Sequence, residues 1–452
     1  MSDRLTRKDG DRDAGGANAA AESELLFAGS PFAFAATVLP DAERPLSERS
    51  IAERIMAERP LNIRHFAALA ATVRHGSLTR AARSVNLTQP ALTQAIAGLE
   101  TTLGVTLFTR SPQGMAATEP AVLIAPRAEA AIAHIGSPRV TGTQLRALLA
   151  LARAGSYAGA AEATGLSSAS LHRAVADLQV ALGQRLVDRR GHHVALTPAG
   201  LRRARGFSLA VAELRAGLDE VAAWQGKAAG RVIVGAMPLC RARWLPEALA
   251  AFVAQHPGVD VAVVEGGHAE LAGPLRDGEI DLMLGALREG AEVEGLAQEA
   301  VFEDSPVLVM RAGHPLLGAE RPELAMLDYP WVLPGSETPL RRHWEAMIRS
   351  LGAQPPRVGV ECGSTMAIRQ LLLKGDGLTL LSPEQVAVEL EAGLLVARAL
   401  PGAFTRTIGI TTRGDWRPTA AQTDFLRLLR ECGRQIDTAA AEKGLKTGLA
   451  EN

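Results

Sequence analysis

One phrase occurs twice in this sequence, 79 residues apart, and it constrains the fold more than any other feature. Leu87 to Arg110 reads LTQPALTQAIAGLETTLGVTLFTR, and Leu166 to Arg189 reads LSSASLHRAVADLQVALGQRLVDR. The alignment extends without gaps to Thr118 in the first copy and Thr197 in the second. This period exceeds that of solenoid repeats, so it indicates a tandem duplication of a small domain.

Each copy predicts three helices followed by a wing hairpin. In the first copy a helix begins near Asn62, a short one covers Leu78 to Val85, and Thr88 can cap a third that has Pro90 in its first turn. The apolar spacing of the third helix predicts its buried face in both copies, which we assign to Leu92, Ile96, Leu99, Leu171, Val175 and Leu178. A short helix, a tight turn and a longer helix form a helix-turn-helix.

The start of the third helix in the first copy carries side chains suited to reading DNA. A recognition helix reaches base edges with residues near its N-terminus, here Gln89, Pro90, Thr93 and Gln94. Gln pairs bidentately with adenine, and Thr offers a hydroxyl and a methyl group. The surrounding donors predict phosphate contacts, for which the candidates are Ser77, Thr79, Arg80, Arg83, Thr88 and Arg110.

The second copy keeps the buried positions but changes the exposed ones. Its outward positions are Ser168, Ser170, His172 and Arg173, and the Gln-Pro start is lost. Arg189 and Arg190 make its wing more basic than that of the first copy, which favours some contact with DNA. The alternative is that the second copy serves as a spacer or a dimer support.

The pattern of predicted secondary structure changes at about residue 230. Residues 201–228 form a long amphipathic helix whose apolar stripe needs a partner, and we expect that partner to be the twin helix of a second chain. Beyond it, strands and helices alternate, starting with RVIVGA, VDVAVVEG and IDLMLGA. This alternation predicts an α/β domain with mostly parallel strands.

These motifs together resemble the LysR-type transcriptional regulators. The resemblance rests on the GS-x-x-x-AA pair of short helices, the L-T-Q-P-A-L-T-Q-x-I helix and the LE-x-x-LG-x-x-LF-x-R exit, and it continues through VIVGAMPLCRARWLPEALAAFVAQHPGVDVAVVEG and GEIDLMLGAL. The second helix-turn-helix departs from the family, which usually has one. The resemblance implies a multidomain fold: two α-helical winged helix-turn-helix units, a long linker helix and a two-lobed α/β effector domain like periplasmic binding proteins.

The predicted boundaries follow from these readings. They are a disordered or weakly helical leader at 1–60, units at 61–136 and 140–200, the linker helix at 201–228, the effector domain at 230–436 and a flexible tail at 437–452. Within the effector domain, lobe I takes about 230–302 and 413–436, and lobe II takes 303–412.

The resemblance places a ligand between the two lobes, outside the C-terminal ends of the strands. The residues selected there are Met237, Leu239, Cys240, Arg241, Thr338, Leu340, Arg341, Ser364 and Thr365. Hydroxyls at helix N-termini, together with arginine, suit a small organic acid. Two alternatives stay open: Thr338 and Ser364 act only as helix caps, and Leu239 and Cys240, where many family members have Ser or Thr, favour a more apolar contact.

Bulk properties limit the function further. The net charge is −1, so a DNA-binding surface must be local. Three dispersed cysteines and an N-terminus without an apolar segment indicate a reducing, cytoplasmic location without a signal peptide or membrane span. We expect no cofactor beyond the effector and no enzyme activity, since no P-loop, GxSxG, HExxH or Rossmann motif occurs.

The expected partners are double-stranded DNA, the organic-acid effector, and further copies of the chain in a homodimer or homotetramer, with RNA polymerase as another candidate. Two other functions remain open. The chain could be a soluble small-molecule-binding protein that uses its helical front for protein contacts, or an enzyme on the same two-lobed fold.

Overall fold

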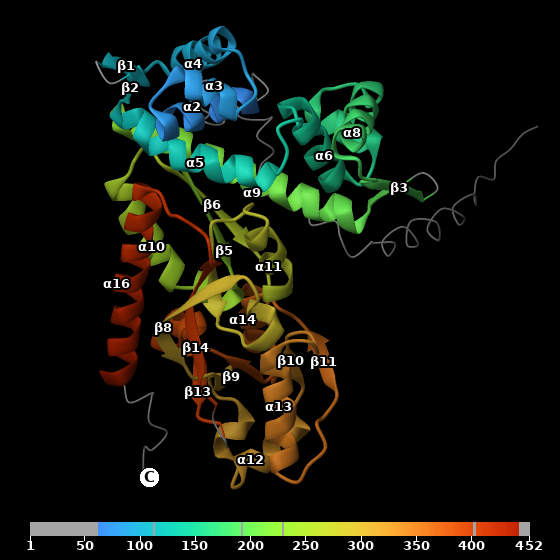
Figure 1. Cartoon of the computed structure of the whole chain (residues 1–452). Helices are drawn as coiled ribbons and strands as arrows, with labels where there is room; N and C mark the ends of the chain where they lie inside the picture. Colours follow the sequence, from blue (N-terminus) through green and yellow to red (C-terminus); the bar gives the residue numbers. More distant parts are fainter. Residues whose placement is uncertain (1–61, 112–113, 191–192, 228–229, 401–403, 443–452) are drawn as a thin grey trace, which may run out of the picture.

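The computed structural model describes residues 62–442 except 112–113, 191–192, 228–229 and 401–403. Two small helical units lie on one side of a pair of long helices, and an elongated α/β domain lies on the other side (Figure 1). The leader, the end of the C-terminal tail and the turns of both wings fall outside the described residues.

The two helical units have the same architecture. The first contains α2 (Ile63–His75), α3 (Leu78–Ser84), α4 (Gln89–Leu103), β1 (Phe108–Ser111) and β2 (Gly114–Ala117). The second contains α6 (Gly142–Ala154), α7 (Tyr157–Thr164), α8 (Ser168–Leu182), β3 (Val187–Arg190) and β4 (His193–Leu196). Each element of the second unit begins 79 residues after its counterpart, so the duplication read from the sequence is a duplication of structure.

Equivalent side chains make equivalent contacts in the two units. Thr88 caps α4 by accepting the N–H of Ala91, and Ser167 caps α8 by accepting the N–H of Ser170. Both helices end at a glycine in the left-handed region, where other residues are strained. Behind them, the Glu100 carboxylate accepts the N–H of Leu107 at 2.7 Å, and the Gln179 amide oxygen accepts that of Leu186 at 2.8 Å.

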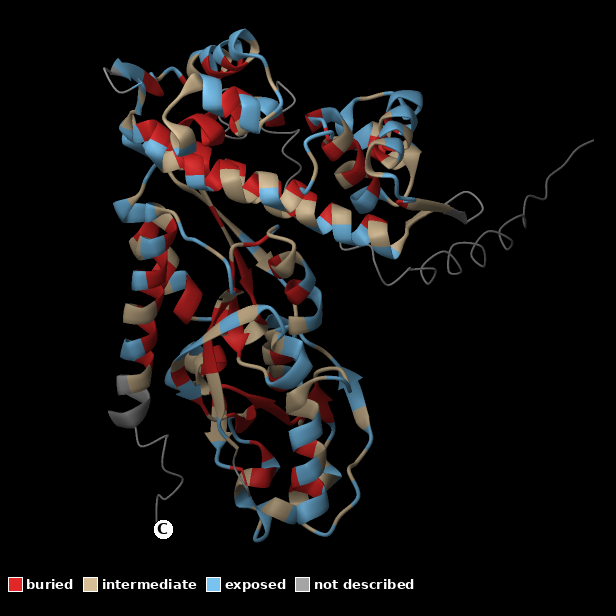
Figure 2. Ribbon diagram, in the orientation of Figure 1, coloured by how far each residue is buried: buried red, intermediate tan, exposed pale blue. Residues whose placement is uncertain are grey.

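Each unit is followed by a long helix, and the two helices pack side by side. These are α5 (Glu119–Ile135) and α9 (Pro198–Trp224), which share one apolar core with both units. Buried residues lie along this pair and along the central strands of the α/β domain (Figure 2). The prediction expected the apolar stripe of α9 to pack on its twin in a second chain, whereas α5 of the same chain packs against it here.

Lobe I of the α/β domain is a five-stranded sheet in the order β6-β5-β7-β14-β8. Its strands are β5 (Arg231–Ala236), β6 (Asp260–Glu265), β7 (Leu282–Ala286), β8 (Leu296–Asp304) and β14 (Arg406–Arg413). Helices α10 (Trp244–Gln255) and α16 (Ala420–Glu442) share an apolar core with the sheet, in which Trp244, Phe252 and Phe425 are fully buried. Helix α11 (His268–Arg276) packs against the sheet through a separate apolar cluster that contains Met283.

Lobe II is smaller and contains two sheets. One has the order β12-β9-β13, and the other pairs β10 with β11. The strands are β9 (Val307–Arg311), β10 (Trp331–Leu333), β11 (Val358–Glu361), β12 (Thr379–Leu381) and β13 (Leu395–Arg398), and the helices are α12 (Pro322–Ala325), α13 (Pro339–Ser350), α14 (Thr365–Lys374) and α15 (Ala387–Glu391). Trp331 and Trp344 meet at 5.2 Å between ring centroids in its core.

The prediction of mostly parallel strands is wrong. Parallel pairing holds for β5 with β6, β5 with β7 and β10 with β11. In contrast, β14 is antiparallel to both β7 and β8, and β9 is antiparallel to both β12 and β13. The chain crosses from lobe I to lobe II after β8 and returns before β14, so the returning strand enters the first sheet in the opposite direction. Strands β8 and β13 were not predicted.

Candidate DNA interface and effector cleft

The predicted DNA-reading residues of the first unit are exposed on one side of α3 and α4. Gln89, Pro90, Thr93 and Gln94 are all exposed in the first turns of α4. The Thr79 hydroxyl on α3 donates to the Gln89 side-chain oxygen at 3.3 Å, which orients that amide. The Thr93 hydroxyl donates to the backbone oxygen of Gln89 at 3.0 Å, so its methyl group and lone pairs remain for a base edge.

The predicted phosphate contacts lie around this helix. Arg80 and Arg83 are exposed on α3, and Arg110 is exposed on the wing strand β1. Ser77 precedes α3 without capping it through its side chain, whereas the Thr88 hydroxyl caps α4. The first unit therefore presents a recognition helix with cationic and hydroxyl groups beside it.

The second unit presents its helix with different side chains. Ser168, Ser170, His172 and Arg173 are all exposed on α8. The ring of His172 lies 5.0 Å from that of Tyr157, centroid to centroid, and the Ser168 hydroxyl donates to the backbone oxygen of Tyr157 at 3.3 Å. Tyr157 thus fixes the start of α8 against α7.

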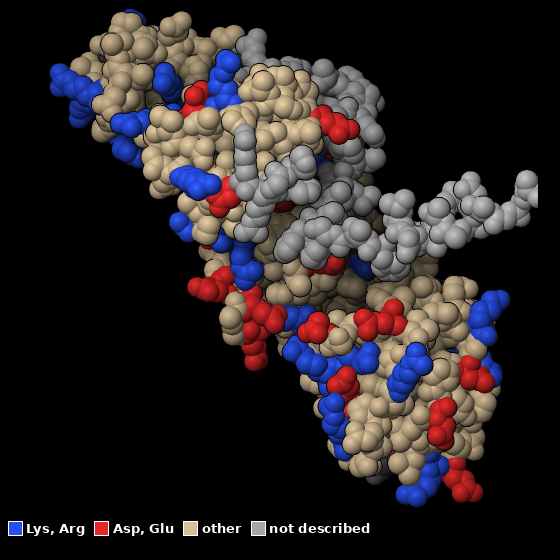
Figure 3. All heavy atoms as spheres, turned by 90° about the vertical axis from the view of Figure 1, so that its right-hand side faces the viewer, with Lys and Arg blue, Asp and Glu red and all other residues tan. Residues whose placement is uncertain are grey.

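Charge is distributed unevenly between the two halves of the molecule. On the face drawn in Figure 3, Lys and Arg predominate at the upper end that holds the helix-turn-helix units, whereas both signs mix over the effector domain. The strand β3 carries Arg189 and Arg190, whose side chains lie outside the described residues. An overall charge of −1 therefore coexists with a locally basic end.

In the α/β domain, the turns that follow parallel strands lie in pairs. In lobe II, the Cys362 N–H donates to the Leu333 backbone oxygen at 2.8 Å, so the turns after β10 and β11 are neighbours. In lobe I, the Met237 N–H donates to the Leu284 backbone oxygen at 3.0 Å, so the turns after β5 and β7 are neighbours. Each lobe offers one such edge, as expected for a ligand cleft.

The hydroxyls selected from the sequence act locally in this structure. Thr338 and Ser364 cap α13 and α14 by accepting the N–H groups of Arg341 and Ala367. The Thr365 hydroxyl accepts an amide N–H of Gln385 at 2.8 Å. These contacts agree with the alternative reading of Thr338 and Ser364 as helix caps.

The turn after β5 is apolar and largely enclosed, which favours an apolar contact with a ligand over a contact with an anion. Met237 and Cys240 are buried and Leu239 is half-buried, while Arg241 pairs with Glu265. Burial raises the pKa of the Cys240 thiol, Asp304 raises it too, and the nearby Arg406 and Arg241 oppose the shift. The thiol is therefore protonated and poorly nucleophilic.

Arg341 remains a suitable contact for an anion. Its side chain is 14% exposed, and its Nε lies 3.5 Å from the Glu345 carboxylate. The guanidinium lies 5.2 Å from the centroid of the Trp344 ring, and Nε and Nη1 make no hydrogen bond to the described residues. Leu340, beside it, is half-buried.

The same strand-end rule also selected the segments 285–288 and 334–342 from the sequence, but not Arg288, Arg342 or Arg406 as individual contacts. Burial lowers the pKa of Arg288, which follows β7 in lobe I, and the positive charges of Arg406 and Arg342 lower it further while Glu292 opposes them. Arg406 is partly neutralised by Asp304 at 2.7 Å. Arg288 in turn pairs with Glu292 at 3.4 Å, so each of these two arginines of lobe I has a carboxylate partner. The segments containing Arg288 and Arg342 follow strands, which was the available signal.

The two lobes also contact each other directly. Arg243, in the segment after β5, bridges Glu247 of α10 and Glu384 of lobe II, with both nitrogen–oxygen distances at 2.9 Å. These hydrogen bonds raise the pKa of Arg243. The bridge joins the edge of lobe I that holds Cys240 to the segment of lobe II that contacts Thr365.

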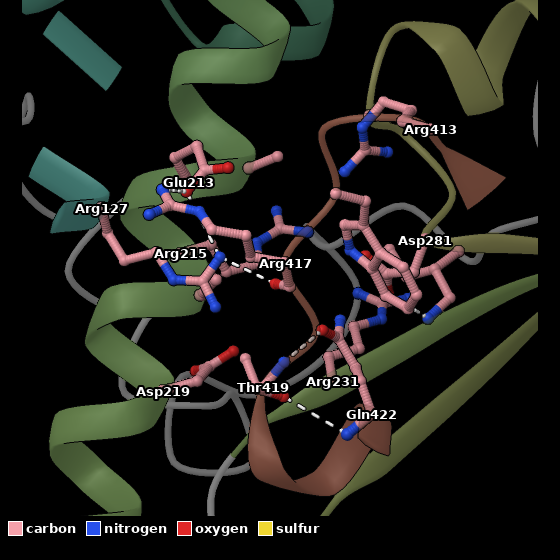
Figure 4. Close-up of a pocket in the computed structure, with 15 residues that line it drawn as sticks. Arg127, Glu213, Arg215, Asp219, Arg231, Asp281, Arg413, Arg417, Thr419 and Gln422 are labelled. Atoms are coloured by element: carbon pink, nitrogen blue, oxygen red, sulfur yellow. Dashed lines mark hydrogen bonds and ion pairs between the residues drawn. The ribbon is translucent and has the colours of Figure 1, made fainter. Parts of the chain in front are cut away.

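A second polar site joins the helix pair to the effector domain. Arg127 of α5 is 5% exposed and pairs with Glu220 at 2.7 Å and Glu213 at 3.3 Å, both on α9. Burial lowers the pKa of Arg127, but Glu220 and Glu213 raise it overall. Arg127 also donates to the backbone oxygen of Arg417, whose side chain pairs with Glu213 at 2.9 Å (Figure 4).

Neither a metal centre nor a membrane span is found in the part of the chain that the structure describes. Its His, Cys, Asp and Glu side chains form no group of three or more able to hold a metal ion. Among the same residues, no helix has the length and apolarity needed to cross a bilayer.

Comparison with known proteins identifies the same parts. A family model described as the LysR substrate binding domain matches residues 225–433. A second, described as the bacterial regulatory helix-turn-helix protein of the lysR family, matches twice, at 63–121 and 143–201. The effector domain and both copies of the repeat are thus recognised independently.

Among similar proteins is the HTH-type transcriptional regulator GalR of Pseudomonas putida, 32% identical over 395 residues, with 84% of this chain and 98% of that protein covered. The transcriptional regulator PcaQ of Agrobacterium fabrum is 27% identical over 303 residues, with 66% and 96% covered. The solved structure of ArgP from Mycobacterium tuberculosis matches with a TM-score of 0.50 at 18% identity, covering 64% of this chain and 96% of that one, which supports the fold alone.

Proposed function

Because this chain belongs to the LysR family of bacterial transcriptional regulators, with helix-turn-helix and effector-binding domains, we propose that it reads promoter DNA with both α4 and α8 under the control of an organic anion. The DNA half rests on the matched exposure of the starts of α4 and α8 in two units of the same architecture. Gln89 and Gln94 suit adenine, and Arg173 suits guanine.

The arginines of the two lobes support an anionic effector. Arg406 of lobe I and Arg342 of lobe II both lower the pKa of Arg288, although Arg288 pairs with Glu292 at 3.4 Å and Arg406 with Asp304 at 2.7 Å. Arg341 keeps two buried nitrogens without hydrogen-bond partners among the described residues. A carboxylate would satisfy these groups and relieve their mutual repulsion. In this proposal the protein acts by binding rather than by catalysis. A cytoplasmic location and a contact with RNA polymerase are further predictions.

Footprinting tests the DNA half of the proposal. The wild type is compared with Gln89→Ala and Arg173→Ala over a range of salt concentrations. We expect salt-dependent protection, with a different segment lost in each variant. If only Gln89→Ala alters the footprint, α8 does not read DNA. If the wild type protects no DNA at all, the helical front serves another partner.

Ligand-induced thermal stabilisation tests the effector half. A panel of aromatic and sugar acids is compared with their uncharged amides, and the acids are expected to raise the melting temperature by mass action. Arg342→Ala should remove this effect. Arg321→Ala, at a 75% exposed side chain next to α12, should keep it. Equal stabilisation by acids and amides would contradict the proposal that the effector is an anion.

A further inference from the structure

The two long helices that follow the two units run antiparallel to each other. Near the end of α5, a side chain at Gly206 of α9 would come within 2.6 Å of the backbone oxygen of His134. Near the start of α5, a side chain at Gly217 would come within 3.0 Å of the Ile124 side chain. The contacts thus run from the end of α5 to its start as α9 advances, and glycines allow the close approach.

These contacts are reciprocal under the 79-residue repeat. Gly206 is equivalent to Arg127, and His134 is equivalent to Glu213. Gly206 lies against His134, and Arg127 pairs with Glu213. When residue i contacts j, the counterpart of j therefore contacts the counterpart of i, which is the property of a two-fold interface between identical subunits. The equivalent residues Ala131 and Ala210 lie midway between these contacts and are both buried.

The two helix-turn-helix units, which we call the reading heads, are related by the same two-fold relation. Helix α2 packs on α5 and helix α6 packs on α9, so each unit contacts the helix that follows it. The wings project at opposite ends of the helix pair, and α4 and α8 lie on the side away from the effector domain (Figure 1). The backbone of one chain thus has the symmetry of a dimer of DNA-binding units.

We infer that one chain is a complete two-headed reader of a DNA site with two unlike half-sites. This inference rests on the proposed function. A symmetric dimer reads a palindrome because its two recognition helices are identical. Here the pseudo-symmetric scaffold sets two half-sites in inverted orientation, while the side chains differ. The positions of Gln89, Pro90, Thr93 and Gln94 correspond to Ser168, Ala169, His172 and Arg173.

Base preferences follow from these side chains. The glutamines of α4 favour adenine in the first half-site, and Arg173 favours guanine in the second. A second chain is not needed to complete the pair, because α5 already covers the face of α9 that would receive its twin. One effector domain therefore serves two reading heads.

Selection from random duplex DNA tests the inference, followed by measurement of the mass of the protein–DNA complex. The full chain should enrich a non-palindromic site with two unlike halves and bind it as one chain per duplex. A palindrome, or two chains on the shortest site, overturns the inference and leaves the proposed function standing. Enrichment of no sequence overturns the proposed function, and the inference with it.

Variants assign each half-site to one head. Gln89→Ala should reduce discrimination by about 5- to 150-fold in the first half only, and Arg173→Ala by a similar factor in the second half only. The combined variant Ser168→Gln, Ala169→Pro, His172→Thr and Arg173→Gln gives α8 the reading residues of α4. It should convert the selected site to a palindrome while keeping one chain per duplex.

A matched control transfers a residue that does not face the start of the helix. Val180→Thr also gives α8 the residue of α4 at the equivalent position, at a side chain that is 82% exposed. It should leave both half-sites unchanged. If the combined variant folds, as its circular dichroism would establish, and still selects the original second half-site, then α8 does not read DNA and the inference fails.

Discussion

His343 follows Arg342 on α13, and its titration should report on a bound anion. Its ring stacks on Phe404 at 4.1 Å between centroids. Burial lowers its pKa, and the positive charges of Arg342 and Arg406 lower it further. Free protein near pH 7 therefore holds a neutral imidazole beside a cationic cluster.

Effector binding is predicted to take up a proton at this residue. A bound anion favours the imidazolium, so the pKa of His343 is higher in the complex than in the free protein. Affinity should therefore rise as the pH falls from about 7.5 through the bound-state pKa of His343, and level off below its lowered free-state pKa. Calorimetric titrations in buffers of different ionisation enthalpy measure the uptake.

Two histidine variants separate this site from the rest of the protein. His343→Asn should reduce the pH dependence of the affinity in this range, and any remainder is expected from His268, whose pKa is lowered by burial and by Arg288. His256→Asn, at the residue that follows α10 and stacks on Phe252, should keep the dependence. Proton release on binding in the wild type would contradict a nearby anion.

At the residue scale, the sequence predicted the exposure of the side chains at the starts of α4 and α8, but not the local contacts of the hydroxyls chosen for ligand binding. Gln89 and Arg173 stand at fixed positions in a recognisable motif, so their exposure follows from helix geometry. Thr338 and Ser364 also stood at helix starts, but capping and ligand binding use the same residue types. Arg406 could not be found, since β14 reaches the cleft only through the return crossing between lobes.

At the scale of elements, α5 was not recognised from the sequence as the equivalent of the linker helix α9. The stretch is rich in alanine and contains Pro126, and it was placed within the first unit although Ile124, Ala128 and Ile135 lie on one buried face. The 79-residue repeat was the available signal, because Thr118 matches Thr197 and both precede a helix with proline in its first turn. The small residues are needed for the close approach to α9.

The contact between α5 and α9 predicts a strong effect of a single methyl group. Gly206→Ala places Cβ against the His134 backbone oxygen, which must move, and overpacking of this kind costs about 1–3 kcal/mol. A lower melting temperature and weaker DNA binding are expected. Gly359→Ala, in β11 with open space around it, should change neither. An unchanged melting temperature in Gly206→Ala would mean that the helices are not packed this closely.

At the scale of the whole molecule, the alternation of strands and helices in the sequence did not predict the direction of every strand. Alternating strands and helices predicted parallel pairing, and that holds for β5, β6 and β7. The direction of β14 depends on the double crossing between lobes, which leaves no mark in local periodicity. The order of domains, in contrast, followed directly from the motifs.

Arg127 ties the DNA-binding half to the effector domain and should be sensitive to substitution. Arg127→Met removes a buried cation from the half-buried Glu220 and Glu213, although Glu213 keeps Arg417 at 2.9 Å. Breaking a fully buried pair costs about 3–5 kcal/mol, and we expect a loss towards the lower end of that range. Arg74→Met removes an exposed pair between α2 and Glu129 and should cost less than about 1 kcal/mol. Urea unfolding followed by circular dichroism compares the two, and equal losses would contradict a buried junction.

The short connection between α5 and α6, residues 136–141, has a consequence for how a regulator works at low copy number. Two subunits that meet only by collision separate on dilution, and occupancy then depends on the square of their concentration. Two heads on one polypeptide meet DNA at a local concentration set by the tether, so occupancy depends on the first power. Each half of the operator can also change sequence independently, because a substitution in one helix leaves the other helix intact.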